Sequence, residues 1–523
     1  MTMIKSLILG SAAGLIAVGG AQAADLPVKA KAVEYVRICS LYGAGFFYIP
    51  GTDTCIKLGG YVRVDTTFNG FTYGGPAWSG DLGQGNRYRD YFTSRSRMAL
   101  TVDTRTATEY GVVRTFGQAD FQFDNFNNGT RNPSSVVAAP NGTGLFNSSQ
   151  LSGAGGGYVA VEMVFIQFAG FTFGKSASAY ATPWNGYPGN NNSFLMGGAD
   201  YVTGVNNIQY TAQFGNGVSG TIGLDDPTVF NRTSVLNLGV ASGFASAGAN
   251  AYAGTHAPDI VGNIRVDQAW GLFQISGMAH LVNASYNILG AGGVPTALSE
   301  ISGHPEDKWG GAVMAALQIK NLPTGAGDDL KIDVSYAKGD TKAVVATSGA
   351  SPNFVMFGST GRAGAYQSIG FGQTSDAVYV PGGELKLVDS WGIRGAFNHN
   401  WDPYCSTSLW GSYSQVRYDG SVGDLTSAKG ALCAGYVAAT GGLATKTADF
   451  SCNPDFNVAM VGAVTRWTPV KNLTFSAEVG AFFLDQKFTG GSILTPAAPK
   501  PTALYEFRDQ STVFLNARVQ RNF

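Results

Sequence analysis

Ser-Thr-Val-Phe-Leu-Asn-Ala-Arg-Val-Gln-Arg-Asn-Phe, residues 511–523, is the stretch of sequence that decides the fold. Its side chains alternate with the period of two that is typical of a β-strand. The apolar set is Val513, Leu515, Ala517, Val519 and Phe523, and the polar set is Thr512, Asn516, Arg518, Gln520 and Asn522. Such a strand needs hydrocarbon on one face and water on the other, and its backbone edges cannot stay unpaired in lipid. A closed barrel meets all of these requirements.

The composition of the whole chain agrees with strands that cross a membrane. Of the 523 residues, 72 are Gly, 12% are aromatic and only 13% are charged, against about 25% charged residues in soluble proteins. The mean hydropathy is near zero, which strands with one polar face produce. The net charge is −1 and no basic block occurs, so we expect no nucleic-acid partner.

The first 23 residues predict a cleaved secretory signal. Lys5 precedes an apolar run from Leu7 to Val18, and Ala21-Gln22-Ala23 supplies small residues before a cut at Ala24. The apolar run is too short for a membrane anchor. We therefore expect an exported protein with three regions: the signal 1–23, an N-terminal segment 24–54 on the periplasmic side, and a transmembrane β-barrel 55–523.

The five cysteines indicate two disulfides, because an exported protein meets an oxidising compartment. Cys39 and Cys55 bracket a short segment rich in Gly and aromatic residues, and we expect them to pair. Cys433 and Cys452 lie in one long loop and form the second expected pair. Cys405 is then left as an unpaired thiol.

The alternation seen in the last strand recurs along the chain, for example in Ile56–Asp65, Met98–Arg105 and Ile208–Phe214. Connections between such stretches alternate in length. Ala169-Gly170 and Trp270-Gly271 are short, whereas the connections richest in Gly, Ser, Asn and Thr are long, namely 69–94, 124–157, 341–384 and 419–456. These features predict an all-β fold, a 16-stranded antiparallel transmembrane β-barrel with short periplasmic turns and long outer loops. The even strand count also brings the last strand beside the first.

Several motifs also carry a resemblance. Tyr35–Cys39, Tyr42–Thr52, Cys55–Arg63, Phe171–Lys175, Trp467–Leu473 and the final Phe523 resemble the general-diffusion porins of alphaproteobacteria along the whole mature chain. The resemblance implies a homotrimer in the cell outer membrane, surrounded by lipid, with the third outer loop folded into the lumen. It also implies a passive channel for small hydrophilic solutes and ions. The alternative is a substrate-specific, sugar-type channel or a surface-binding barrel protein.

By this resemblance the constricting loop is 175–200, which contains Trp184, Tyr187 and Asp200. The loop is rich in Gly, Asn and Ser and is too long for a hairpin turn. The residues alone favour an ordinary surface loop, and the inward fold is what the resemblance implies. In the family this loop is often acidic and faces arginines on the wall, but here no carboxylate occurs before Asp200, which departs from the family pattern.

Charged side chains on the predicted inner faces of the first strands are candidates for the pore wall. They are Arg63, Arg95, Arg97 and Arg114, interleaved with Asp65, Asp103 and Asp120, and joined by Glu162 on the fourth strand. Such charges tune ion selectivity through their field on a narrow water column. The alternative is that Arg and Asp pair structurally and cancel. Because the signs are nearly balanced, we predict weak selectivity.

Catalytic motifs do not emerge. Gly174-Lys175-Ser176 lacks the earlier Gly that a phosphate-binding loop needs, because position 169 is Ala. The four histidines are scattered, and no Gly-x-Ser-x-Gly elbow occurs. His280 is more simply a hydrogen-bond donor of the pore wall. We therefore expect no enzyme activity, no cofactor and no metal.

Overall fold

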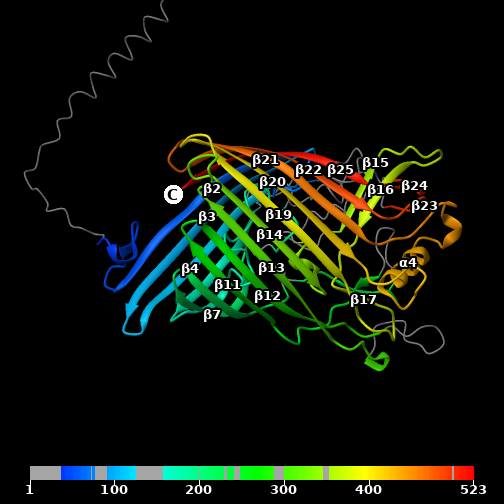
Figure 1. Ribbon diagram of the computed structural model, residues 1–523, viewed down its shortest axis with the longest axis horizontal. Helices are drawn as coiled ribbons and strands as arrows, with labels where there is room; N and C mark the ends of the chain where they lie inside the picture. Colours follow the sequence, from blue (N-terminus) through cyan, green and yellow to red (C-terminus); the bar gives the residue numbers. More distant parts are fainter. Residues whose placement is uncertain are drawn as a thin grey trace, which may run out of the picture.

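The computed structural model describes residues 37–71, 73–76, 91–124, 157–199, 201–228, 232–240, 248–287, 300–345, 353–496 and 500–523. Within these residues sixteen strands form one closed antiparallel barrel (Figure 1). The sixteen-stranded barrel predicted from the sequence is thereby confirmed. The expected signal, residues 1–23, lies outside the described residues.

Each barrel strand pairs with the next along the chain, and the last pairs with the first. The strands are β2 (Thr54–Phe68), β3 (Phe92–Thr108), β4 (Gly111–Asp124), β5 (Tyr158–Phe168), β6 (Phe171–Ser176), β7 (Val205–Gly215), β8 (Val218–Asp225), β11 (Asp259–Gln268), β12 (Gly271–Val282), β13 (Lys308–Lys320), β14 (Asp329–Lys338), β19 (Asp389–Asn400), β20 (Cys405–Arg417), β21 (Phe456–Val470), β22 (Leu473–Gln486) and β25 (Gln510–Asn522).

The closing strand β25 has the two faces that its sequence predicts. Val513, Leu515 and Val519 are exposed on the outside, whereas Asn516 is buried on the inside. The register with β2 runs from Tyr61↔Asn522 to Phe68↔Leu515. Arg521, which falls on the outer side, donates a hydrogen bond to the Lys471 carbonyl near the barrel rim. The last strand therefore closes the barrel with its polar face inward.

The two rims of the barrel differ, as the alternating connection lengths predict. One rim carries tight turns such as 109–110, 169–170 and 471–472. Residues 37–53 lie at this rim, where the 3-10 helix η1 (Ser40–Tyr42) leads to strand β1 (Phe47–Tyr48), which pairs with β2. The Cys39–Cys55 disulfide fastens this segment to the barrel. The predicted first disulfide is confirmed.

The other rim carries additional structure built from the long loops, and Figure 1 shows it beyond one end of the barrel. It contains a sheet of β9 (Val235–Asn237), β10 (Ala249–Asn250), β17 (Ala377–Tyr379) and β18 (Lys386–Leu387), and a second sheet of β15 (Phe354–Gly358), β16 (Gln367–Gly372), β23 (Gly491–Leu494) and β24 (Ala503–Phe507). The helical pieces are α4 (Ala428–Ala439), η3 (Glu300–Ser302), η4 (Thr341–Ala343) and η5 (Leu443–Thr445).

Helix α4 is held against these loops by the second predicted disulfide, Cys433–Cys452, which is also confirmed. Tyr436 of α4 packs against Phe371 and Phe488, which makes an aromatic core outside the barrel wall. Among the described residues, Cys405 is the one free cysteine, as expected. No helix in the described part of the chain is long and apolar enough to span a membrane.

Gly60 permits a close backbone contact between β2 and β3. Its φ is +151°, and an added Cβ would lie 2.0 Å from the Ala99 carbonyl oxygen. Gly60 also exchanges two backbone hydrogen bonds with Phe523, at 3.3 and 3.1 Å. The C-terminal residue is thus seated on a position that tolerates no side chain.

We predict that Gly60→Ala destabilises the barrel, because strain at such a backbone position costs about 1–3 kcal/mol. The measurement is the temperature at which the folded band converts to the unfolded band on an SDS gel. Gly117→Ala is the matched control, since a Cβ there meets no atom within 4 Å. Equal transition temperatures for the two variants would contradict the proposed role of Gly60.

Candidate functional site

The connection between β6 and β7, residues 177–204, lies inside the barrel. Inward-facing side chains of the wall hold its backbone. The Asn263 amide of β11 donates to the Ala179 carbonyl, and the Gln274 amide of β12 donates to the Ala181 carbonyl, both at 2.6 Å. The third outer loop therefore folds inward, as the resemblance implies for 175–200. Asp200 itself lies outside the described residues.

The tip of the inward loop is anchored to the far wall by a carboxylate. Glu478 of β22 is fully buried and accepts hydrogen bonds from the backbone amides of Asn191 and Asn192, at 2.8 and 2.9 Å. Beside it, the Arg466 guanidinium donates to the Gly189 carbonyl at 2.5 Å. The charged groups of this contact are therefore wall side chains, whereas the loop contributes uncharged backbone amides and a carbonyl.

The return arm of the loop is anchored on a buried ion pair. Arg394 of β19 pairs with Asp333 of β14 at 2.9 Å and donates to the carbonyls of Leu195 and Ala199, at 3.3 and 2.7 Å. A Cβ at Gly198 would lie 2.2 Å from the Asp333 carboxylate. The glycine therefore lets the loop backbone lie directly on the wall.

Trp184 and Tyr187, both predicted for the constriction, are part of this loop. The Trp184 indole donates to the Gly186 carbonyl at 3.0 Å, and the Tyr187 hydroxyl donates to the Ser193 carbonyl at 2.7 Å. The Arg394 guanidinium carbon lies 5.4 Å from the centre of the Tyr187 ring. The polar ends of both aromatic side chains are thus used to hold the shape of the loop.

The predicted arginine wall divides into two clusters, of which the first is buried. Asp65 accepts from Arg95 at 2.8 Å and from Arg518 at 2.5 Å. Arg97 pairs with Asp120 at 2.5 Å and with Glu162 at 3.4 Å. Asp65, Arg95, Arg97 and Asp120 are at most 7% exposed. This placement favours the structural pairing that was the alternative for these residues.

Tyr73, from the connection between β2 and β3, covers this first cluster. Its ring centre lies 4.7 Å from the Arg95 guanidinium carbon and 5.5 Å from that of Arg97. Its carbonyl accepts a hydrogen bond from the Ser193 amide of the inward loop at 3.0 Å. A tyrosine, rather than an acidic loop, therefore faces the arginines.

The second cluster lies toward the tight-turn rim and is half-buried. Asp103 pairs with Arg114 at 3.0 Å and with Arg105 at 3.1 Å, and both arginines keep more than a quarter of their side-chain surface exposed. Arg63 donates to the Gln520 amide oxygen at 2.8 Å and is also half-buried. Among the predicted residues, Arg63, Asp103 and Arg114 are the best placed to face water.

Glu162 reaches the inner face because of a β-bulge. Opposite Gln118 and Ala119, the partners are Met163 and Val161, so Glu162 is the extra residue of β5. Val159 and Val161 before it, and Val164 and Ile166 after it, are exposed on the outer face. The alternation of outward-facing residues thus shifts by one position at Glu162.

Sequence reasoning missed the residues that hold the loop, namely Asp333, Arg394, Arg466 and Glu478. The inward orientation of Asp333, Arg394 and Glu478 was readable from the alternation of their strands, whereas the strand of Arg466 is apolar on both faces in places and left its orientation open. Their hydrogen-bond partners could not be read from the sequence, because partners such as Asn191 and Glu478 are 287 residues apart in the chain. His280, expected to be a pore-wall donor, faces inward but is fully buried against Asp259 at 2.6 Å.

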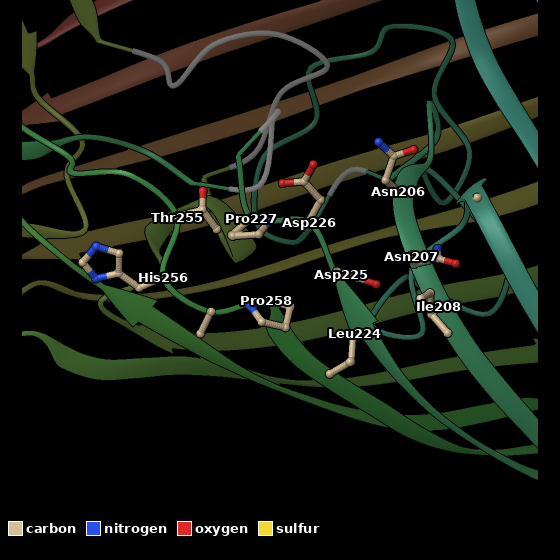
Figure 2. A pocket seen from close by; sticks show the side chains of 12 residues that line it. Asn206, Asn207, Ile208, Leu224, Asp225, Asp226, Pro227, Thr255, His256 and Pro258 are labelled. Carbon is tan, nitrogen blue, oxygen red and sulfur yellow. The ribbon is translucent and has the colours of Figure 1, made fainter.

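One well-formed cavity lies on the outer side of the barrel wall. This cavity of about 560 Å³ is lined by residues of β6, β7 and β8 and by the segments that follow β8 and precede β11 (Figure 2). Ile208 and Leu224 of this lining are exposed on the outer face, so the cavity lies outside the lumen. In the described part of the chain, no three His, Cys, Asp or Glu side chains are arranged to hold a metal ion.

Comparisons with known proteins agree with this geometry. A family model described as a porin subfamily matches residues 25–515. Porin Omp2b of Brucella abortus and porin Omp2b of Brucella melitensis are each 34% identical over 271 residues, which is 51% of this chain and 63% of the relative. The matched region therefore spans less than two thirds of these curated relatives. The outer membrane channel DcaP of Acinetobacter baumannii shares the fold, with a TM-score of 0.52 at 12% identity over 91% of this chain and 99% of that chain.

We predict that Glu478→Gln loosens the tip of the inward loop, because a hydrogen bond to a charged acceptor contributes about 1.5–3 kcal/mol. Hydrogen exchange at the Asn191 and Asn192 amides should become faster. Asp485→Asn is the matched control, since this carboxylate on the same strand pairs with Lys487 instead. Unchanged exchange at both amides would rule out Glu478 as the anchor.

Proposed function

We propose that this chain, which belongs to the porin family by its match over residues 25–515, forms a passive, water-filled channel for small hydrophilic solutes and ions. Its location is the outer membrane. The observation that carries the proposal is the loop 177–204, which wall side chains hold inside a closed barrel. Such a loop narrows the lumen in a fixed position, because wall side chains hold both of its arms.

Size exclusion follows from this arrangement. A barrel of sixteen strands is wide enough to leave an aqueous lumen that wall side chains alone do not fill. The inward loop then sets the width. Because its tip binds the wall through backbone groups of Asn191 and Asn192, the loop adds no charge there. We propose that discrimination is by size first and by charge second.

Weak ion selectivity is the second part of the proposal. Arg95, Arg97, Asp65, Asp120 and Glu162 are engaged in buried ion pairs, so their fields largely cancel. Arg63, Asp103 and Arg114 are the predicted residues that we propose face the water. Near the tight-turn rim, Arg265 and Lys320 both approach Asp267, at 3.1 and 3.6 Å, so one of these two positive charges is compensated.

A sugar-specific channel receives less support. A binding platform for a sugar needs an aromatic face and free polar groups. The polar groups of Trp184 and Tyr187 instead donate hydrogen bonds to carbonyls within the loop. We further propose that residues 1–23 are a cleaved signal, that 24–54 lie on the periplasmic side, and that the chain assembles as a homotrimer. The signal rests on the residue pattern of 1–23, the periplasmic side on the rim at which residues 37–53 lie, and the homotrimer on the resemblance noted in the sequence.

We expect the purified protein to insert into planar bilayers in units that close in three equal conductance steps. Under a salt gradient the reversal potential should stay near zero, because most of the predicted wall charges are in ion pairs. A protein that folds but never conducts would contradict the channel. A reversal potential close to that of an ideally selective pore would contradict weak selectivity.

Arg63→Gln should shift the reversal potential toward cation preference, because it removes a positive charge from the inner face. One charge at 4 Å in water contributes about 1 kcal/mol, so the permeability ratio should change by about fivefold or less. Arg521→Gln is the matched control, since Arg521 lies on the outer side of the adjacent strand. The role of Arg63 would be refuted if both variants behaved alike.

A further inference from the structure

A second segment of the chain enters the barrel mouth beside the inward loop. It follows β14 and comprises residues 340–345, which include the 3-10 helix η4. Asp340, Thr341, Val344 and Val345 are all 0% exposed. A run of fully buried residues directly after a barrel strand is unusual for a surface loop, because loops normally follow the protein surface.

This segment pairs with the inward loop through its backbone. The Gly197 amide donates to the Val344 carbonyl at 2.8 Å, and Gly198 forms a parallel bridge with Val345. The same two glycines lie on the barrel wall, where a Cβ at Gly197 would be 2.6 Å from the Ile393 carbonyl oxygen. The wall, the inward loop and residues 340–345 are therefore stacked in contact.

Apolar packing strengthens the contact between the two segments. Val344 and Val345 belong to the same buried cluster as Leu195, Met196 and Tyr201 of the inward loop. The inward loop and residues 340–345 therefore share one buried apolar cluster.

We propose that residues 340–345 are a second constriction element, and that Asp376 is the residue that positions it. This inference rests on the proposed channel function. Asp376 lies between β16 and β17, and its carboxylate is fully buried. One carboxylate oxygen accepts from the backbone amide and the hydroxyl of Thr341, at 2.7 and 2.9 Å.

The other oxygen of Asp376 ties the segment to the rest of the rim and to the wall. It accepts from the Thr233 amide and the Tyr252 hydroxyl, both at 2.8 Å. The Tyr252 hydroxyl also lies 3.0 Å from Nε2 of His280, whose other ring nitrogen contacts Asp259 of β11. Asp376 thus joins three loop segments to two barrel strands. Loss of a partner from such a buried network leaves polar groups unsatisfied, which is costly.

The test compares Asp376→Asn and Thr341→Val with the wild-type protein in planar bilayers. Asn replaces one acceptor oxygen by a donor, and Val removes the Thr341 hydroxyl at nearly constant volume. We expect a larger single-channel conductance, with current fluctuations between sub-states, because residues 340–345 leave the lumen more often. Thr341→Ser keeps the hydroxyl, so this variant should have the same single-channel conductance as the wild-type protein.

Asp455→Asn is the matched control. Asp455 is another buried carboxylate of the long-loop rim, but it holds α4 by accepting from the Tyr418 amide at 2.9 Å and from Lys429 at 2.6 Å. Its conductance should equal that of the wild-type protein. An increase as large as that of Asp376→Asn would overturn the inference, because general loosening of the rim would then suffice.

The outcomes separate this inference from the channel itself. If the wild-type protein conducts, and folded Asp376→Asn and Thr341→Val conduct identically, the second constriction element is refuted and the channel stands. If the wild-type protein does not conduct, the proposed function fails and the inference fails with it. Should Asp376→Asn not reach the heat-modifiable folded form, the Thr341→Val and Thr341→Ser pair decides the question.

Discussion

The constraint on which this structure depends is that no strand edge can stay unpaired in lipid. A backbone N–H or C=O without a partner costs several kcal/mol in hydrocarbon, so the pairing of β25 with β2 is obligatory rather than optional. That pairing determines which face of every strand points to water, because the register between two paired strands fixes which side chains share a face. The inward set of residues, from Asp65 to Asn516, follows from closure at this one seam.

Inside the barrel, charge serves mainly to hold structure. Arg394 with Asp333, and Glu478 beside Arg466, bind a loop that contributes backbone groups to those contacts. The Arg95–Asp65 and Arg97–Asp120 pairs are sealed beneath Tyr73. A buried ion pair is costly to break because the remaining partner stays charged and desolvated. The inner charges therefore fix the position of the loop, and only a few half-buried groups remain to act on passing ions.

Much of the fold was predictable from local patterns. The alternation in residues 511–523 predicted the closing strand, connection lengths predicted the two rims, and cysteine positions predicted both disulfides. The site was less predictable. Of the predicted wall residues, Arg63, Arg114 and Asp103 are half-buried, whereas Arg95, Arg97, Asp65 and Asp120 are buried. The inward orientation of Glu162 depends on a β-bulge. A single sequence does not reveal this bulge, because it shifts the alternation by only one residue.

The sequence by itself determined the sidedness of the strands with unbroken alternation, the number of strands and the lengths of the loops, because each of these depends on residues that are neighbours in the chain. Only the tertiary structure decided where the loops go and which charges are paired. Asn191 is hydrogen-bonded to Glu478, which is 287 residues away in the chain, and Ala199 is hydrogen-bonded to Arg394, which is 195 residues away. Residues 340–345 enter the barrel mouth for the same reason. Their partners, Asp376 and the backbone of Gly197 and Gly198, come together only after the barrel has closed around them.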